Sequence, residues 1–152
     1  MTATLNIVAI RRALNGDAAA IASLVTSLGY PTSASEMRDR LAAILPRRDY
    51  ASFVAELDGE VVGFAGAMVG HFYERNGLYG RLVVLVVDST RRGARIGEEL
   101  VREIERWSVE QGASELLVNS GNERVDAHRF YLRLGYRNTG IRFVKVLTGD
   151  ET

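Results

Sequence analysis

The sequence predicts an α/β (α+β) fold: one mixed, mostly antiparallel sheet with about four helices. Its 152 residues, 47% hydrophobic and 25% charged, suit a single globular domain over residues 1–152. Apolar residues recur with both the two-residue period of strands and the period of helices. The predicted order is strand, helix, helix, three strands, helix, strand, helix, strand. This order, in which an antiparallel meander leads into a βα unit, is no regular βαβ alternation.

The first part of the chain is predicted to form one strand and two helices. "LNIVAIR" (5–11) has the alternation of a strand. From Asp17 onward apolar residues fall at helical spacing, and "GYP" ends that helix. Ser33 and Glu36 have the spacing of a capping box, which predicts a second helix that ends near Pro46.

The middle of the chain is predicted to form three strands. "YASFVAEL" and "VVGFAGAMV" flank Asp58-Gly59, a pair typical of a β-hairpin turn. The glycines of the second segment favour close packing or a bulge. "RLVVLVV" (81–87) is apolar on both faces, which predicts a central strand covered on both sides.

The last part of the chain is predicted to contain two helices and two strands. Apolar residues at helical spacing predict a long helix that ends near Gln111. "ELLVN" (115–119) follows as a buried strand, and a helix over 125–134 closes with Gly135 as its C′ residue. "IRFVKVL" (141–147) is predicted to be the last strand.

Composition excludes several classes of function. Nineteen basic and nineteen acidic side chains balance, so bulk charge favours neither nucleic acid nor a membrane surface as partner. No cysteine is present, and two histidines far apart in sequence argue against a metal centre. The N-terminus lacks the pattern of a signal peptide, and the apolar run 82–87 is too short to span a bilayer. We expect a cytoplasmic protein.

One stretch, "VVDSTRRGARIGEEL" (86–100), concentrates positive charge between a strand and a helix. It contains three arginines and two glycines: Arg91, Arg92, Arg95, Gly93 and Gly97. Unpaired N–H groups at a helix N-terminus, approached closely through glycine, bind phosphate. The alternative is that Glu98 and Glu99 complement the helix dipole while the arginines are solvated. No P-loop or dinucleotide-binding glycine pattern is present.

The same stretch resembles the acyl-CoA-binding motif of the GCN5-related N-acetyltransferases (GNAT), whose core is Arg/Gln-x-x-Gly-x-Gly/Ala. Arg92 matches its first position and Gly97 its last, whereas Arg95 replaces the middle glycine. This departure affects the closest backbone approach. Backbone amides can still face a pyrophosphate if the φ angle of Arg95 is negative.

A second block, "AHRFYLRLGYRNTGIRFVKVL", is similar to the closing block of that family, A-x-x-x-Y-x-x-x-G-[FY]. The matching residues are Ala127, Tyr131, Gly135 and Tyr136. An Asn common in the family three residues before the alanine is replaced by Arg124, although Asn119 and Asn122 are near in sequence. "ELDGEVVGFAG" also looks like the family's hairpin. The resemblance covers the whole chain and implies a GNAT-like sheet in which the parallel fourth and fifth strands splay apart.

The resemblance implies direct transfer of an acetyl group from acetyl-CoA to a primary amine, with no metal. It makes Tyr131 the general acid that protonates the departing CoA thiolate; a core role for this tyrosine is the alternative. The implied cofactor-binding residues lie on the central strand, in the arginine turn and near the replaced Asn: Leu85, Val86, Val87, Arg92, Gly93, Ala94, Arg95, Ile96, Gly97, Asn119 and Arg124.

The base and the acceptor site are less defined. The segment 81–87 lacks the glutamate that family members often have there, which leaves His71, Glu74, Glu56 or a water chain as candidate bases. The acceptor wall implied by the resemblance contains an aromatic, partly anionic set suited to a cation: Tyr30, His71, Phe72, Tyr73 and Glu74. Ordinary loop residues are the alternative.

The leading hypothesis is an N-acetyltransferase of small-molecule amines, such as aminoglycoside-like polyamines or amino acids. Two alternatives stay open: a protein acetyltransferase acting on Nα or Lys amines, and a non-catalytic acetyl-CoA-binding regulatory module. Neither a nucleic acid nor a membrane is expected as partner. A homodimer is an open alternative, because many members of the family dimerise.

Overall fold

The computed structural model describes residues 7–91, 95–119 and 125–149. The chain divides into two compact units, the first ending at Val118 and the second beginning at Asn119. Each unit is described by itself.

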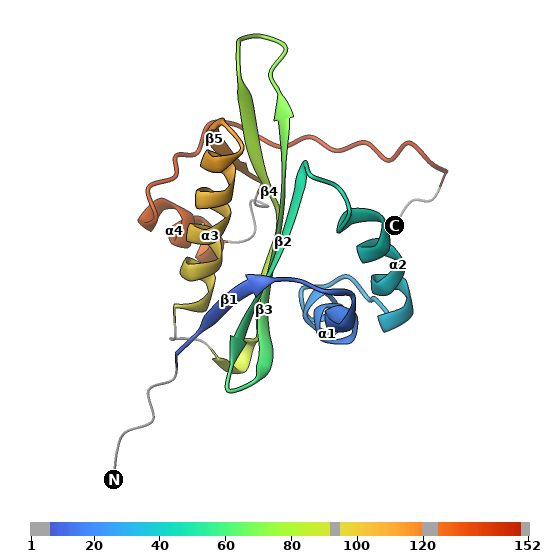
Figure 1. Ribbon diagram of the computed structural model, residues 1–152. Coiled ribbons are helices and arrows are strands. Elements are labelled where there is room, and N and C mark those ends of the chain that lie inside the picture. The colour runs from blue at the N-terminus through green and yellow to red at the C-terminus, as the bar shows by residue number, and fades with distance from the viewer. Residues whose placement is uncertain (1–6, 92–94, 120–124, 150–152) are drawn as a thin grey trace. The chain divides into compact units, whose positions relative to one another are not determined.

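The first unit is built on a five-stranded sheet with the order β1-β2-β3-β4-β5 (Figure 1). Its strands are β1 (Ala9–Arg12), β2 (Tyr50–Leu57), β3 (Glu60–His71), β4 (Leu78–Val87) and β5 (Ala113–Val118). Neighbours from β1 to β4 are antiparallel, and β5 is parallel to β4. The predicted mixed, mostly antiparallel sheet is confirmed. The first strand begins later than predicted, at Ala9, while residues 5 and 6 lie outside the described residues.

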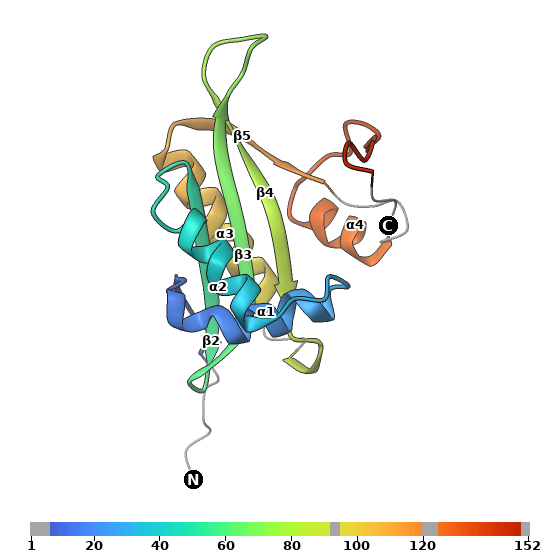
Figure 2. The ribbon, with the colours of Figure 1, turned by 90° about the vertical axis from the view of Figure 1, so that its right-hand side faces the viewer.

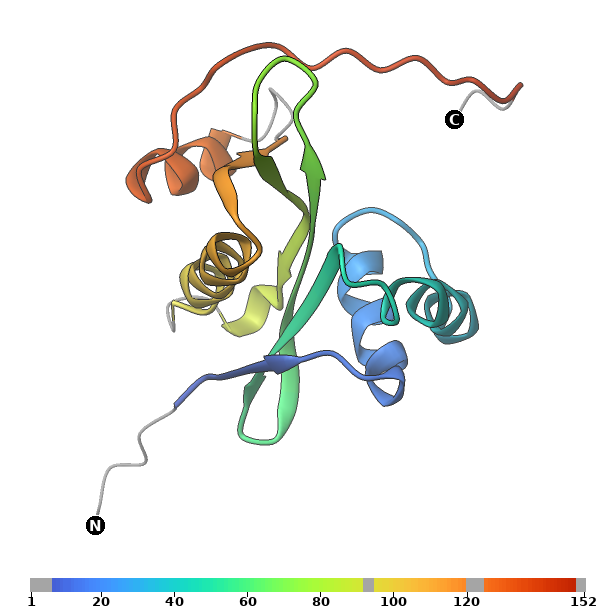
Figure 3. The same cartoon turned by 45° about the horizontal axis from the view of Figure 1, so that its top comes forward.

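Helices cover both faces of the sheet. The helices α1 (Ala18–Ser27) and α2 (Ala34–Ile44) lie on one face and α3 (Ile96–Glu110) lies on the other (Figure 3). On the first face Ile21 and Leu41 join Val54, Phe64 and Val86 in a buried apolar cluster. On the second face α3 buries the predicted stripe, which consists of Ile96, Leu100, Ile104 and Trp107.

Local signals set the ends of these helices. The Glu36 N–H donates to the Ser33 hydroxyl at 3.0 Å, and the Ser33 N–H donates to the Glu36 carboxylate at 2.9 Å, so the capping box is confirmed. The helix expected from Asp17 begins instead with a 3₁₀ turn, η1 (Asn15–Asp17), before α1. The Asp17 carboxylate closes that turn, because it accepts from the Leu14 N–H at 2.8 Å.

The hairpin between β2 and β3 is confirmed. Asp58 (φ 53°) and Gly59 (φ 79°) both adopt the positive φ angles of a type I′ turn. The glycines of β3 have the predicted packing roles. A Cβ on Gly63 would lie 2.9 Å from the Ile96 side chain, and Gly66 adjoins a bulge between β3 and β4.

Two predictions about strand burial were wrong. The strand β4 is central, between β3 and β5, yet Arg81 is exposed and the Val83 side chain is 57% exposed, so the strand is not covered on both faces. The strand β5 was expected to be buried but is largely half-exposed to exposed, with Leu117 at 39%. As the end strand of the described sheet, β5 pairs with β4 alone.

The second unit contains α4 (Val125–Arg133). Gly135, at φ 95°, follows it, and the Tyr136 N–H donates to the Tyr131 carbonyl at 3.0 Å, so the predicted C-terminal glycine is confirmed. The strand predicted over 141–147 is wrong: this segment has no regular structure, and its large apolar side chains are exposed. Alternation is a local signal, whereas a strand also requires a hydrogen-bonded neighbour.

Candidate functional site

The first feature of the site is the end of the pairing between β4 and β5. Their pairing ends at Leu82 and Val118, while β4 continues to Val87 against β3. Figure 2 shows β4 continuing past the end of β5. The second half of β4 therefore has a strand neighbour on one side only in the described part of the chain.

Backbone groups of β4 point to that open edge in alternation. The Asp88 N–H donates to the Val62 carbonyl of β3 at 2.8 Å. Because donors and acceptors alternate sides along a strand, those of Val86 also face β3, and those of Leu85 and Val87 face the open edge. Of the three residues predicted on this strand, Leu85 and Val87 present backbone groups there, whereas the Val86 side chain is buried under α1 and α2.

The second feature is the N-terminus of α3. Arg95 is its N-cap residue and makes no side-chain cap, and the first helical hydrogen bond runs from the Glu99 N–H to the Arg95 carbonyl at 3.0 Å. The N–H groups of Ile96, Gly97 and Glu98 therefore lack a capping side chain from Arg95 and are suited to an anion.

The backbone of Arg95 corrects the sequence prediction. Its φ angle is +58°, not negative, so the residue occupies the left-handed conformation that glycine adopts without strain. The Arg95 side chain is 80% exposed and its Nε lies 3.6 Å from the Glu98 carboxylate. The preceding turn residues Arg92, Gly93 and Ala94 lie outside the described residues.

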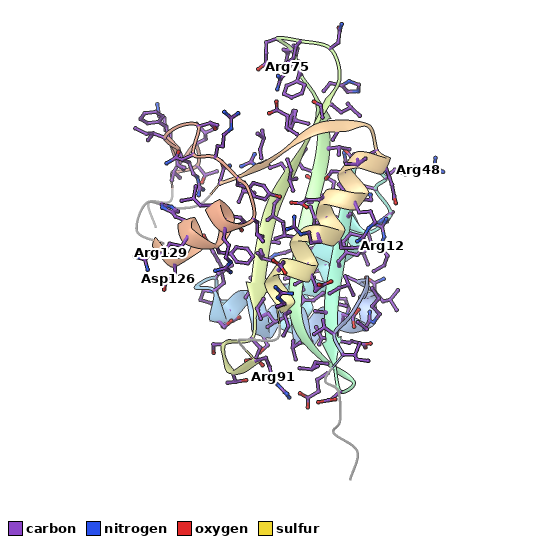
Figure 4. All side chains as sticks on the ribbon, turned by 90° about the vertical axis from the view of Figure 1, so that its left-hand side faces the viewer. Arg12, Arg48, Arg75, Arg91, Asp126 and Arg129 are labelled. Atoms are coloured by element: carbon purple, nitrogen blue, oxygen red, sulfur yellow. The ribbon has the colours of Figure 1, made fainter. Side chains whose placement is uncertain are left out.

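Asp88 and Arg91 make the polar contacts of the first part of the connection between β4 and α3, residues 88–91. The Asp88 carboxylate accepts from the N–H and from the hydroxyl of Thr90, both at 2.9 Å. These bonds, the backbone one first, lower the pKa of Asp88 below its ordinary value and keep it charged. The Arg91 guanidinium, in the same connection, lies 3.1 Å from the Glu60 carboxylate (Figure 4). An open strand edge and a helix N-terminus thus belong to one βα unit, which fits a long ligand with amides at one end and a diphosphate at the other.

Comparison with known proteins decides the family. The model of the acetyltransferase (GNAT) family matches residues 18–136. The chain belongs to the GNAT family. It is an N-acetyltransferase whose co-substrate is acetyl-CoA.

Two relatives and one solved structure support this assignment. The chain is 37% identical over 111 residues to an aminoalkylphosphonate N-acetyltransferase of Salmonella typhimurium, covering 72% of this chain and 71% of the relative. It is 32% identical over 134 residues to an aminoglycoside N(6′)-acetyltransferase type 1 of Stenotrophomonas maltophilia, covering 86% of each. A structure of an aminoglycoside N-acetyltransferase in complex with CoA superposes with a TM-score of 0.85 over 97% of this chain and 100% of that chain. Its identity of 22% shows the fold alone.

Three further GNAT positions belong to the second unit or follow β5. Tyr131 lies on α4, half-buried, with its ring 5.1 Å from that of Phe130 and 5.7 Å from that of Tyr136. Asn119 is exposed directly after β5, and Arg124 lies outside the described residues. The role of Tyr131 stays a prediction.

The predicted acceptor residues fall in two segments of the GNAT fold. Tyr30, 61% exposed, lies in the connection between α1 and α2. His71 ends β3, and residues 72–74 form part of the β3–β4 connection. This connection projects beyond the end of the sheet that lies away from the α1–α2 connection (Figures 1 and 2). The structure therefore does not bring Tyr30 together with the other four residues. At the projecting hairpin the Arg75 guanidinium covers the Phe72 ring at 4.0 Å and pairs with Glu115.

Of the candidate bases, Glu56 is already engaged. Its carboxylate lies 3.1 Å from the guanidinium of Arg11, which also binds Asp17. His71 and Glu74 are exposed at the projecting hairpin.

Sequence reasoning passed over Arg81, an exposed cation on β4. The available signal was the one charged residue in the apolar segment 81–87.

The described residues contain neither a candidate metal centre nor a helix that could span a membrane. Among residues 7–91, 95–119 and 125–149 no three His, Asp or Glu side chains are grouped as metal ligands. Within the same ranges no helix has the length and apolar character needed to cross a membrane.

Proposed function

We propose that this GNAT enzyme transfers the acetyl group of acetyl-CoA directly to a primary amine of a small molecule. The observation that supports it most is the similarity, over most of the chain, to two acetyltransferases that are named for small-molecule amines, an aminoalkylphosphonate and an aminoglycoside. The proposal includes a cytoplasmic location, and a homodimer stays an open alternative.

The first half of the proposal concerns acetyl-CoA, which supplies the activated acetyl thioester. The backbone groups of Leu85 and Val87 at the open edge of β4 would bond its pantetheine amides. The N–H groups of Ile96 and Gly97, with the turn 92–95, would hold its diphosphate. The exposed guanidinium of Arg95 adds positive charge at this point. Asn119 and Arg124 remain candidate contacts to the cofactor.

The second half of the proposal concerns proton transfer. The neutral amine nitrogen attacks the acetyl carbonyl carbon, the carbon–sulfur bond breaks, and the thiolate takes a proton from the Tyr131 hydroxyl. The amine gives up one proton to a base or to water, which restores the proton balance when the Tyr131 phenolate is reprotonated. No described residue is assigned as this base. Tyr30 and residues 71–74 remain candidate acceptor contacts from two separate segments.

The test is release of free CoA thiol from acetyl-CoA in the presence of a panel of small amines and of peptides with free N-terminal or Lys amines. We expect thiol release with at least one small amine, whose acetylated product mass spectrometry would identify. Faster turnover of peptides would favour the protein acetyltransferase. If the protein binds acetyl-CoA in a calorimetric titration but none of the amines or peptides causes thiol release, the proposal is overturned in favour of a binding module.

The same titration tests the diphosphate contacts. An Arg92→Ala, Arg95→Ala double variant is expected to bind acetyl-CoA more weakly than the wild type, because two cations are removed from the turn. An Arg47→Ala variant, whose exposed guanidinium pairs with Asp49, serves as the control. Equal affinity of the double variant and the wild type would exclude these arginines from the cofactor site.

A further inference from the structure

Arg81 is an exposed cation on β4 at the last residue pairs before β4 and β5 separate. Its neighbours across the sheet are Met68 on β3 and Leu117 on β5, and neither is charged. With the residues that the structure describes, Arg81 makes no hydrogen bond or ion pair. The sheet therefore presents a positive charge without a counter-ion in the described part of the chain.

The face to which Arg81 points follows from its two neighbours in sequence. A Cβ on Gly80 would meet the Ser108 side chain of α3, and Leu82 is 4% exposed. Because side chains alternate along a strand, Arg81 points to the opposite face. On that face α1 and α2 cover Phe64 and Val86, but Figure 2 shows β4 and β5 extending uncovered by these two helices further along the sheet.

The charge of this uncovered face is set by Arg81. Glu115 of β5 places a carboxylate on the same face. It lies opposite Tyr79, the residue of β4 that precedes Arg81 on that face. Glu115 pairs with Arg75 of the β3–β4 connection, so those two charges cancel. The adjacent Val83 has no partner on β3, because a bulge leaves it between two paired residues. A bulge at this point turns β4 just where its open edge begins.

We propose that Arg81 binds an acidic group on the acceptor, so that the substrate is a small amine that also bears a carboxylate or phosphonate and is not a polycation. This inference rests on the proposed function. The open edge of β4 begins beyond the next residue, and α3 lies against the other face at Gly80, which leaves the face of Arg81 for the approach of the amine. A guanidinium binds a planar or tetrahedral oxyanion through two parallel hydrogen bonds. It repels a polyamine.

The test compares acceptors that differ only in the group opposite the amine: aminoethylphosphonate, β-alanine and ethylamine, with spermidine as the polycation. We expect the wild type to have a kcat/KM at least ~10-fold higher for one of the two acidic amines than for ethylamine or spermidine. Arg81→Gln should lower that value by ~10- to 100-fold, mainly through KM, and change the value for ethylamine by less than ~3-fold. Arg81→Lys keeps the charge but loses the paired donors. Its kcat/KM for the acidic amine should therefore lie between the values of the wild type and Arg81→Gln.

Arg106→Gln is the matched control, since Arg106 is an exposed arginine of α3 on the other face and should leave acceptor preference unchanged. The affinity of each variant for acetyl-CoA reports whether it is folded. Equal loss with every acceptor in Arg81→Gln, or a wild-type preference for ethylamine or spermidine, would overturn the role of Arg81 and leave the proposed function intact. If none of the amines causes thiol release, the proposed function itself is refuted.

Discussion

Gly80 of β4 and Ser108 of α3 approach so closely that a Cβ added to Gly80 would lie 2.8 Å from the Ser108 hydroxyl oxygen. The Ser108 side chain is buried and donates to the Ile104 carbonyl at 2.8 Å, so its polar group is satisfied within the helix. This contact holds α3 against the half of β4 that still pairs with β5. The open edge lies in the other half of β4, and the N-terminus of α3 is the end of the helix away from Ser108.

Gly80→Ala is expected to lower the free energy of unfolding by ~1–3 kcal/mol, because the added methyl group must displace Ser108 and Leu116. Gly16→Ala is the control, since a Cβ on Gly16 meets nothing within 4 Å, and its stability should be unchanged or slightly higher. Urea unfolding of the three proteins measures the difference. A Gly80→Ala variant as stable as the wild type would mean that α3 lies farther from β4.

The protein should be more stable with glycine than with alanine at position 95. At a φ angle of +58° a side chain costs ~1 kcal/mol relative to glycine, so Arg95→Gly should exceed Arg95→Ala in free energy of unfolding by about that amount. Both variants lose the same charge, which isolates the backbone effect. At Arg91, which lies in a 3₁₀ turn with negative φ, we expect the opposite order. The same order at both positions would contradict the left-handed N-cap.

Stability should fall in acid because of Asp17. Two hydrogen bonds from Arg11, at 2.8 and 2.9 Å, lower the pKa of Asp17, helped by the Leu14 N–H and opposed by desolvation. A carboxyl whose folded-state pKa lies below its unfolded value stabilises the protein above the unfolded value, ~4, and loses this contribution as the pH falls through the folded one. Arg11→Met should therefore be less stable at pH ~7 by ~1–3 kcal/mol and show a smaller loss between pH ~5 and ~2.

Arg47→Met is the control for this pH effect. Arg47 pairs with Asp49 on the exposed surface at 2.8 Å, where water screens the interaction, so the variant should lose less stability than Arg11→Met. Unfolding in urea at a series of pH values compares the two. If Arg11→Met kept the full acid dependence of the wild type, the Arg11–Asp17 pair would not be its source.

Tyr131→Phe tests the general acid. Under the proposed function its kcat should fall ~100-fold or more, because the departing thiolate loses its proton donor, while the affinity for acetyl-CoA stays within ~2-fold. Tyr136→Phe removes a hydroxyl from the ring that lies 5.7 Å from Tyr131 and should keep most of the activity. Wild-type turnover by Tyr131→Phe would assign this tyrosine a packing role.

Features encoded by near neighbours in the chain could be predicted. The capping box of Ser33 and Glu36, the Asp58-Gly59 turn and the glycine after α4 depend on hydrogen bonds and φ angles within a few residues. The apolar stripe of α3 follows from helical spacing. The order of these elements and the two motifs were sufficient to indicate the family that the comparison confirms.

Only the tertiary structure decided which groups are free to bind. Three features depend on what lies beside a segment in space: the end of β4–β5 pairing at Leu82, the exposure of Arg81 and Val83, and the missing strand over 141–147. The positive φ angle of Arg95 is likewise set by how the chain turns from β4 into α3. Strand pairing and burial are contacts between residues distant in sequence, so periodicity can propose a strand without determining its neighbour or its covered face.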